Sequence, residues 1–311
     1  MSGVLPAFVP IWSLTGLGYL LSRFRLLGPG ADQVLTKLTF NVAMPAVLFS
    51  TLLNTPFSAL LNKGVISFAA GTLAAAVAGF TISRFVFRRK LSEWAVSGMA
   101  SCYANAGNLG IPVAVQVLGD STFIVVVLLA QTLFMMPSML ALLETDARAP
   151  DTARWKTLAL LPVRTPVIAA SMLGVLAGTT GLRPPALVMQ PVHLLAGAGV
   201  GVALLALGMS LNPSTPMAPG GAGRRWELAS VVGLKLFAQP AITLAAGLLL
   251  GLPRPLLLAT VVAAALPIAQ NVFIATSQYE LDSRFVRDCV LVSTLVAMVS
   301  LSLIVWVVGL L

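Results

Sequence analysis

Charged side chains are scarce in this chain, and their scarcity excludes an ordinary soluble domain. Asp, Glu, Lys and Arg make up 9% of the 311 residues, and hydrophobic residues make up 58%. Roughly a quarter of an average soluble domain is charged. Apolar runs of about 20 residues recur along the whole length, and about 20 residues are what a helix needs to cross a bilayer. The sequence therefore predicts an all-α membrane protein.

Cysteine, histidine and the common catalytic motifs are nearly absent as well. Cys102 and Cys289 are the only cysteines, so a disulfide framework or a CxxC metal site is excluded, and both are interpreted as packing residues. The single histidine, His193, has no partner nearby in the sequence and is expected at the membrane interface. HExxH, GxSxG and P-loop motifs are missing. We therefore expect neither an enzyme nor an ATP-driven pump, and no cofactor or metal.

Ten apolar runs are long enough to be membrane spans. They lie at roughly 4–22, 34–53, 65–83, 94–118, 121–143, 165–181, 187–211, 229–250, 256–279 and 286–309. Residues 1–22 lack the basic start and the small-residue cleavage site of a signal peptide. We therefore interpret them as the first span.

The net charge of +9 indicates membrane topology rather than a nucleic-acid surface. All Lys and Arg residues except Lys63, Arg183 and Arg254 lie in or beside alternate loops. Loops rich in Lys and Arg face the cytoplasm. We therefore expect a multi-pass protein of the inner (plasma) membrane, with both termini outside the cytoplasm and with the lipid bilayer as its surroundings.

The ten spans divide into two sets of five. Residues 1–143 form one half, residues 165–311 form the other, and a charged connector at 144–164 joins them in the cytoplasm. An odd number of spans in each half inverts the second half relative to the first, so two inverted five-helix repeats are predicted. A Pro/Gly-rich stretch at 212–227 is expected to be a flexible loop.

Two of the spans are interrupted by similar polar sequences. The run at 94–118 contains Asn105-Ala-Gly-Asn108-Leu-Gly110-Ile-Pro112, and the run at 256–279 contains Leu266-Pro267-Ile-Ala-Gln270-Asn271. Asp120 and Asp282 follow the two breaks, 162 positions apart. A broken helix is tolerated in a membrane only where it is buried in protein or lines a watery cavity. Paired breaks in two halves indicate the binding site of a secondary transporter.

The residues at the breaks suit a small anion. The side-chain amides of Asn105, Asn108, Gln270 and Asn271 each offer a donor and an acceptor. Glycine and proline, at Gly110, Pro112 and Pro267, bend or stop a helix, and the freed N–H groups at a half-helix N-terminus attract negative charge. Because no arginine lies near the centre of a span, an anion would depend on helix ends and amides. Hydrogen bonds between helices and simple kinks are the alternatives.

Four more polar side chains fall near the breaks, in two pairs at the same 162-residue offset. They are Gln131, Thr132, Ser293 and Thr294. Their oxygens are expected either to complete a cation site or to tighten helix packing.

Two further residues are candidates on other spans. Asn41, four residues before Pro45, is expected either to close the site from across the interface or to cap a proline kink. Lys235 is expected either to snorkel to the cytoplasmic interface or to pair with Asp282 or the substrate.

These motifs resemble the auxin efflux carrier family. The resemblance rests on Asn-x-Gly-x-x-Gly-Ile-Pro at 105–112, Ala-Leu-Pro and Asn-x-Phe at 265–273, and Leu-Gly-Met-Ser-Leu at 207–211. Asn-x-x-x-Pro-x-x-Leu-Phe from Asn41 and Lys-x-x-x-x-Pro from Lys235 also fit. Plant members carry proline before the first Asn, where this chain has Ala104, and many have a long cytoplasmic loop that this chain lacks.

The resemblance implies a fold shared with bile acid/sodium symporters, in which the fourth and ninth helices cross at their breaks. It implies a scaffold of spans 1, 2, 6 and 7 and a moving transport domain of spans 3–5 and 8–10. Family members are typically homodimers that move organic anions, and bacterial relatives are often described as malate or malonate carriers.

The leading hypothesis is therefore a secondary carrier of small organic anions that works by elevator-type alternating access. The alternative is an anion channel or pore lined by the polar breaks. The sequence leaves the acid, the direction of transport and any coupling to Na⁺ or H⁺ open.

Overall fold

The computed structural model describes residues 4–28, 30–54, 62–136, 138–139, 142–143, 166–212, 222–278 and 283–310. Within these ranges nearly every residue is helical and no strand forms. Five helices are long and apolar enough to span a membrane, and several shorter apolar helices accompany them. The expectation of an all-helical, multi-pass chain is confirmed. The connector at 144–164 and Asp282 lie outside the described residues.

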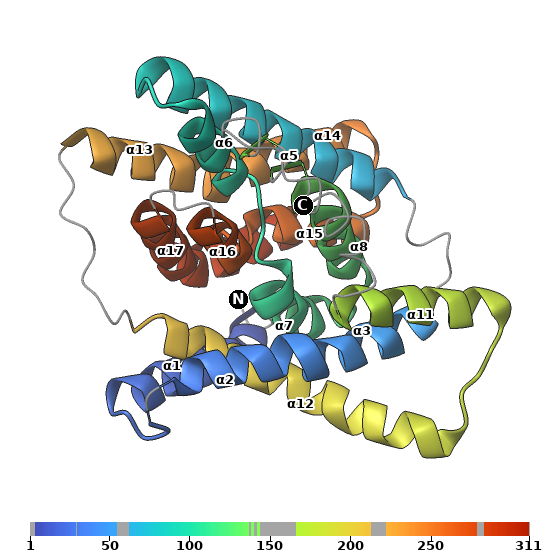
Figure 1. Ribbon diagram of the computed structural model, residues 1–311. Coiled ribbons are helices and arrows are strands. Elements are labelled where there is room, and N and C mark those ends of the chain that lie inside the picture. The colour runs from blue at the N-terminus through green and yellow to red at the C-terminus, as the bar shows by residue number, and fades with distance from the viewer. Residues whose placement is uncertain are drawn as a thin grey trace, which may run out of the picture.

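The helices form two groups, which Figure 1 shows one above the other. The lower group consists of α1 (Val4–Arg23), α2 (Ala31–Leu38), η1 (Thr39–Ala43), α3 (Met44–Leu53), α11 (Pro166–Thr180) and α12 (Ala186–Ser210). In this group α12 lies against α1, α2 and α3, and α11 lies against α3.

The upper group holds most of the remaining helices. It consists of α5 (Lys63–Thr81), η2 (Ile82–Val86), α6 (Leu91–Ala100), α8 (Thr122–Ala130), η5 (Gln131–Met135), α13 (Ala222–Gly233), η6 (Leu234–Ala238), α14 (Gln239–Leu249), α15 (Arg254–Ala265), α16 (Gln270–Gln278) and α17 (Ser283–Leu310). A helical stretch of η3 (Ala106–Gly110), α7 (Ile111–Val113) and η4 (Ala114–Leu118) reaches from this group to α1 and α12.

Proline shapes several of these helices without ending them. A π-helical turn comes just before Pro45, Pro112 and Pro240, in η1, η3 and η6 respectively. Proline has no N–H for the regular helical ladder and clashes with the turn before it. A π-turn widens that turn by one residue, so the helix continues past the proline.

Glycine brings α1 and α12 into backbone contact. A Cβ on Gly208 would run into the backbone of Thr15 and Tyr19, and a Cβ on Gly18 would run into the backbone of Leu205. Gly199 is closed in by Ala43 and Val47, whereas Gly197 and Gly201 have open space around the Cβ position. Close approach of this kind lets helices associate by dispersion where hydrophobic driving force is lacking.

Gly208→Val should lower the unfolding temperature of the detergent-solubilised protein, because the side chain must push α1 away from α12. Overpacking of this kind costs about 1–3 kcal/mol. Gly197→Val is the matched control on the same helix, since a Cβ there meets nothing. Equal unfolding temperatures for the two variants would contradict the close contact between α1 and α12.

Candidate functional site

Two helices of the upper group are interrupted, and the interruptions pair with each other. Residues 101–105 separate α6 from η3, and residues 266–269 separate α15 from α16. Ala104 and Ile268 form an antiparallel bridge. The Asn105 N–H donates to the Pro267 carbonyl at 2.7 Å, and the Ala269 N–H donates to the Tyr103 carbonyl at 3.2 Å. Each break therefore supplies the hydrogen-bond partners that lipid cannot offer.

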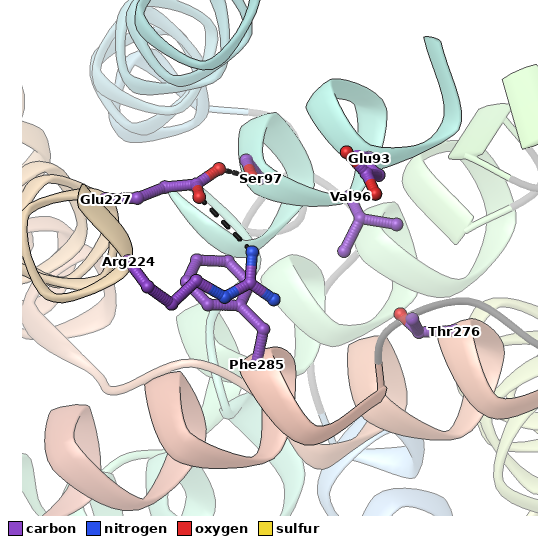
Figure 2. A pocket seen from close by; sticks show the side chains of 7 residues that line it. All are labelled: Glu93, Val96, Ser97, Arg224, Glu227, Thr276 and Phe285. Carbon is purple, nitrogen blue, oxygen red and sulfur yellow. Dashed lines mark hydrogen bonds and ion pairs between the residues drawn. The ribbon is translucent and has the colours of Figure 1, made fainter. Parts of the chain in front are cut away.

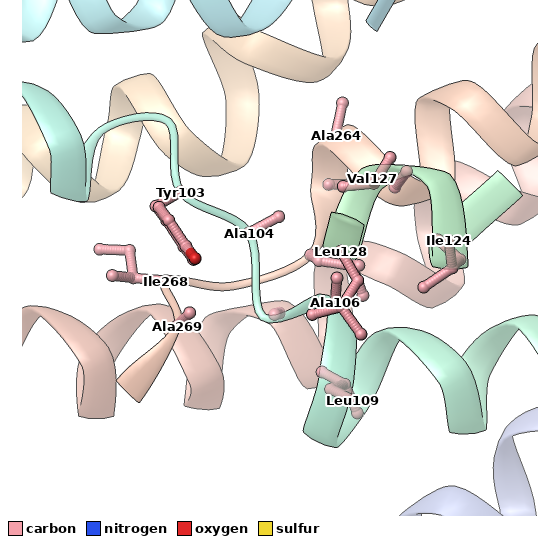
Figure 3. Close-up of a cluster of buried hydrophobic side chains, with 14 of the residues drawn as sticks. Tyr103, Ala104, Ala106, Leu109, Ile124, Val127, Leu128, Ala264, Ile268 and Ala269 are labelled. Atoms are coloured by element: carbon pink, nitrogen blue, oxygen red, sulfur yellow. The ribbon is translucent and has the colours of Figure 1, made fainter. Parts of the chain in front are cut away.

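Apolar side chains close around this pairing. Figure 3 shows Ala104 and Ile268 on the two extended segments, with Leu109, Ile124, Leu128 and Ala264 beside them, all of them buried. Gly110 belongs to this contact, because a Cβ there would meet Leu266 and Ile124. Such a shell keeps the paired backbone dry, which strengthens its hydrogen bonds.

The first break lies earlier than the sequence predicts. We expected the residues from Asn105 to Pro112 to interrupt the helix, but the interruption ends at Asn105, and residues 106–118 are helical. The cause is the π-turn η3, which accommodates Pro112. Asn105 is the N-cap of this turn, and its Oδ1 accepts the Asn108 N–H at 3.2 Å. The motif therefore begins a half-helix rather than breaking one.

The second break lies where the sequence predicts it. Pro267 is inside the interruption, and Gln270 begins α16. Ser293 on α17 holds the extended segment, because its Oγ accepts the Ile268 N–H at 3.1 Å. Thr294 and Thr132 instead donate to carbonyls of their own helices, at Val290 and Leu128.

Two side chains, one from η6 and one from α14, donate hydrogen bonds to the backbone carbonyls at the carboxyl ends of the interrupted helices. The Lys235 ammonium donates to the Ala264 carbonyl at 2.7 Å, and the Gln239 amide donates to the Cys102 carbonyl at 3.4 Å. Lys235 is 0% exposed, so the expectation that it snorkels to the interface is wrong. A cation at a helix C-terminus interacts favourably with the carbonyl dipoles.

The amino ends of the two half-helices face one hollow. It is lined by Tyr103, Ala104, Asn105, Ala106, Gly107, Asn108, Leu128, Gln131, Ala269, Gln270 and Asn271. None of these lining residues carries a charge. The structure thus brings Asn105, Asn108, Gln131, Gln270 and Asn271 together.

Several of the buried polar atoms that have no partner in the described part of the chain belong to residues that line this hollow. They are Asn105 Nδ2, Asn108 Oδ1 and both amide atoms of Gln131. The Tyr103 hydroxyl lies near the side chains of Asn271 and Thr132 without standard hydrogen-bond geometry to either. An unsatisfied buried polar group costs about 1–3 kcal/mol. The cluster is therefore expensive unless a ligand uses it.

One hydrogen bond joins the hollow to the lower group. The Gln270 amide donates to the Ser210 hydroxyl, at the end of α12, at 2.9 Å. Asn41, by contrast, is exposed on η1 and is not among the described residues that line the hollow. The side chain that meets the break from the lower group is therefore Ser210.

A second hollow, shown in Figure 2, is lined by Glu93, Arg224 and Glu227 among other residues. None of the buried unpaired atoms in the described part of the chain belongs to these three charged side chains. The buried carboxylate of Glu227 accepts from Arg89 at 2.6 Å and from Ser97, Ser83 and Arg224 at 3.3 Å. The Arg224 guanidinium also lies 3.8 Å from the centre of the Phe285 ring. This network ties α13 to α6 and η2. The helix α13 begins at Ala222, so the prediction of a loop over 212–227 is wrong for its last residues.

Comparisons with known proteins identify the family of this chain. A family model described as "Membrane transport protein" matches residues 4–305. The chain belongs to this family. It is 27% identical to a Rhizobium meliloti protein described as "Putative malonate transporter", with 97% of this chain and 95% of that protein covered.

Other relatives in the family have broader descriptions. A Methanothermobacter thermautotrophicus protein described as "Uncharacterized transporter" is 26% identical, with 92% of each chain covered. An Escherichia coli K12 protein described as "Uncharacterized transporter YfdV" is 25% identical, with 96% of each covered. The match runs through both breaks in every case, since it covers nearly the whole chain.

Three residues at or near the site, and one at the second hollow, are not singled out from the sequence in these roles. Tyr103 and Gln239 lie in or beside apolar runs, Ser210 was noted only as part of a motif, and Glu227 falls at the end of the Pro/Gly-rich stretch. A usable signal exists for Tyr103 alone, because it stands two residues before the Asn105 motif.

Ser293→Ala should destabilise the protein, because the buried Ile268 N–H loses its acceptor. The expected cost is about 1–3 kcal/mol, measured as the loss of unfolding temperature in detergent. Thr294→Val is the matched control, since this neighbour is equally buried but donates only within its own helix. A larger loss in Thr294→Val would contradict the role given to Ser293.

Proposed function

We propose that this membrane transport protein is a secondary transporter of small organic anions, and that carboxylates bind in the hollow between the half-helix amino ends. One observation carries the proposal: four buried, unpaired amide atoms converge on an uncharged hollow where two helix N-termini meet. Helix N-termini attract anions through their free N–H groups and dipoles. The cation needed at the carboxyl ends is already supplied by Lys235.

We infer an elevator mechanism from the same arrangement. The breaks belong to the upper helices, which we take as the transport domain, and α1, α2, η1, α3, α11 and α12 form the scaffold. The hollow meets the scaffold through one side-chain hydrogen bond, from Gln270 to Ser210. Sliding the transport domain past the scaffold would need this bond to break, together with the one from the Trp12 indole N–H on α1 to the Met298 carbonyl on α17. Each such hydrogen bond contributes only about 1 kcal/mol net.

The finer architecture belongs to the same proposal. We place the chain near the auxin efflux carriers, with ten spans in two inverted five-helix repeats, in the inner membrane with both termini outside the cytoplasm. We also propose a homodimer formed through scaffold helices. The contacts of α1 with α12, of α3 with α11 and of α5 with α14 support two repeats, because each pairs a helix of one half with a helix of the other.

Transport in proteoliposomes tests the function. Radiolabelled malonate, chosen from the description of the Rhizobium relative, should enter vesicles and saturate. Asn105→Asp should abolish this uptake, because it keeps the acceptor for the Asn108 N–H but replaces the free donor with an oxygen that repels a carboxylate. Gln116→Ala, on the same half-helix but exposed, should behave like wild type. Unsaturable, ohmic current would favour the channel instead.

Gln131→Leu should raise the unfolding temperature and lower carboxylate affinity at the same time. Leucine removes two unpaired amide atoms, which relieves about 1–3 kcal/mol per group, but it also removes ligand contacts. Gln239→Leu is the matched control at an equally buried glutamine, whose Nε2 donates to Thr72 and to the Cys102 carbonyl while its Oε1 has no partner among the described residues. It should lose stability. Destabilisation by Gln131→Leu would mean that Gln131 is a structural residue.

A further inference from the structure

We propose that the hollow selects a singly charged carboxylate that also carries a hydrogen-bond donor, in preference to a dianion. The half-protonated form of a short diacid, its half-amide and a short hydroxy acid share this chemistry. The inference rests on the proposed function, because it concerns the same hollow, and it names the class of substrate that the hollow takes.

The first step is the fixed direction of the Asn105 amide. Its Oδ1 accepts the backbone N–H of Asn108, so rotating the amide would set two donors against each other. The Asn105 Nδ2 is therefore held as a donor, buried and without a partner among the described residues. It marks the place of the carboxylate.

The second step is the presence of acceptors beside that donor. Asn108 Oδ1 is buried and unpaired, and so are both the oxygen and the nitrogen of the Gln131 amide. However Gln131 turns, it presents one donor and one acceptor. A ligand that has only acceptors leaves the Gln131 oxygen unpaired, whereas a ligand with one N–H or O–H satisfies it.

The third step is the amount of positive charge. Each helix N-terminus is equivalent to about half an elementary charge, so the two that face the hollow offset about one negative charge. No cationic side chain is among the described residues that line the hollow. Lys235 lies at the carboxyl end of α15, where the Ala264 carbonyl takes its ammonium. A second ligand charge would stay buried and uncompensated, which is costly.

Three matched ligands test the inference without any variant. Malonamate is a monoanion with an amide donor, monomethyl malonate is a monoanion of similar size without a donor, and malonate at pH 7.5 is a dianion. Affinities are measured calorimetrically on wild-type protein in nanodiscs, in sodium-free choline buffer. We expect malonamate to bind about tenfold more tightly than either of the others, which is the effect of roughly one hydrogen bond.

Two further measurements show which group of the ligand can supply the hydrogen-bond donor. Tighter binding of 3-hydroxypropionate than of propionate would extend the class to hydroxy acids. Malonate affinity should rise from pH 7.5 to pH 5 as the monoanion becomes populated, whereas malonamate affinity should not change. Malonamate keeps its charge over this range, so it reports any titration of Tyr103, Cys102 or Lys235, the titratable side chains at the breaks.

The outcomes separate this inference from the function on which it rests. Equal or tighter binding of the dianion or of monomethyl malonate overturns the donor preference while the carboxylate site stands. Sodium that brings monomethyl malonate up to the affinity of malonamate would assign the acceptors to a cation, and also overturns it. If no carboxylate binds wild type, the proposed function itself fails. Gln131→Leu should bring the malonamate to monomethyl malonate affinity ratio close to one.

Discussion

The antiparallel pairing of two broken helices is the constraint on which the rest of this structure depends. Two hydrogen bonds, from the Asn105 N–H to the Pro267 carbonyl and from the Ala269 N–H to the Tyr103 carbonyl, form the Ala104–Ile268 bridge that defines it. Extended backbone in an apolar protein interior is tolerated only if its polar groups find partners. Because each break supplies those of the other, neither can close into a continuous helix without orphaning its counterpart. This mutual dependence places four helix ends at one point.

The carboxyl ends and the amino ends of the half-helices differ in the hydrogen-bond partners that the rest of the fold gives them. The carboxyl ends receive Lys235 and Gln239 from the helix of η6 and α14, and the Ile268 N–H receives Ser293. At the amino ends, the Asn105 side chain caps the Asn108 N–H, and the Ala104 and Ala269 carbonyls accept the N–H groups of Ala106 and Val272. No charged side chain is among the described residues that line the hollow there. Positive partial charge is therefore left facing the hollow while negative partial charge is neutralised behind it. The proposed anion site therefore needs no arginine, which agrees with the absence of arginine near the centre of any span.

The sequence predicted the breaks because glycine, proline and asparagine, clustered inside an apolar run, disfavour a continuous helix. It placed the first break several residues too late, because a proline need not end a helix when a π-turn precedes it, and π-turns leave no clear mark in composition. Lys235 was misread for a related reason. Snorkelling is the usual fate of a lysine near a span end, and only the tertiary fold reveals a carbonyl within reach. Asn41 belongs to a matching motif, yet its helix turns it outward.

Two polar side chains at equivalent offsets from the two breaks have different hydrogen-bond partners. Gln131 and Ser293 stand at the same 162-residue offset. Ser293 is short, reaches the break of its own half and accepts the Ile268 N–H. Gln131 is longer, lines the hollow, and has both amide atoms buried and without a partner among the described residues. A symmetric pair of serines would have braced both breaks and left nothing for a ligand, whereas a symmetric pair of glutamines would have left Ile268 unpaired. The difference satisfies a break on one side, through Ser293, and leaves unpaired amide atoms on a residue of the hollow on the other, at Gln131. These atoms are the ones that the proposed ligand would use.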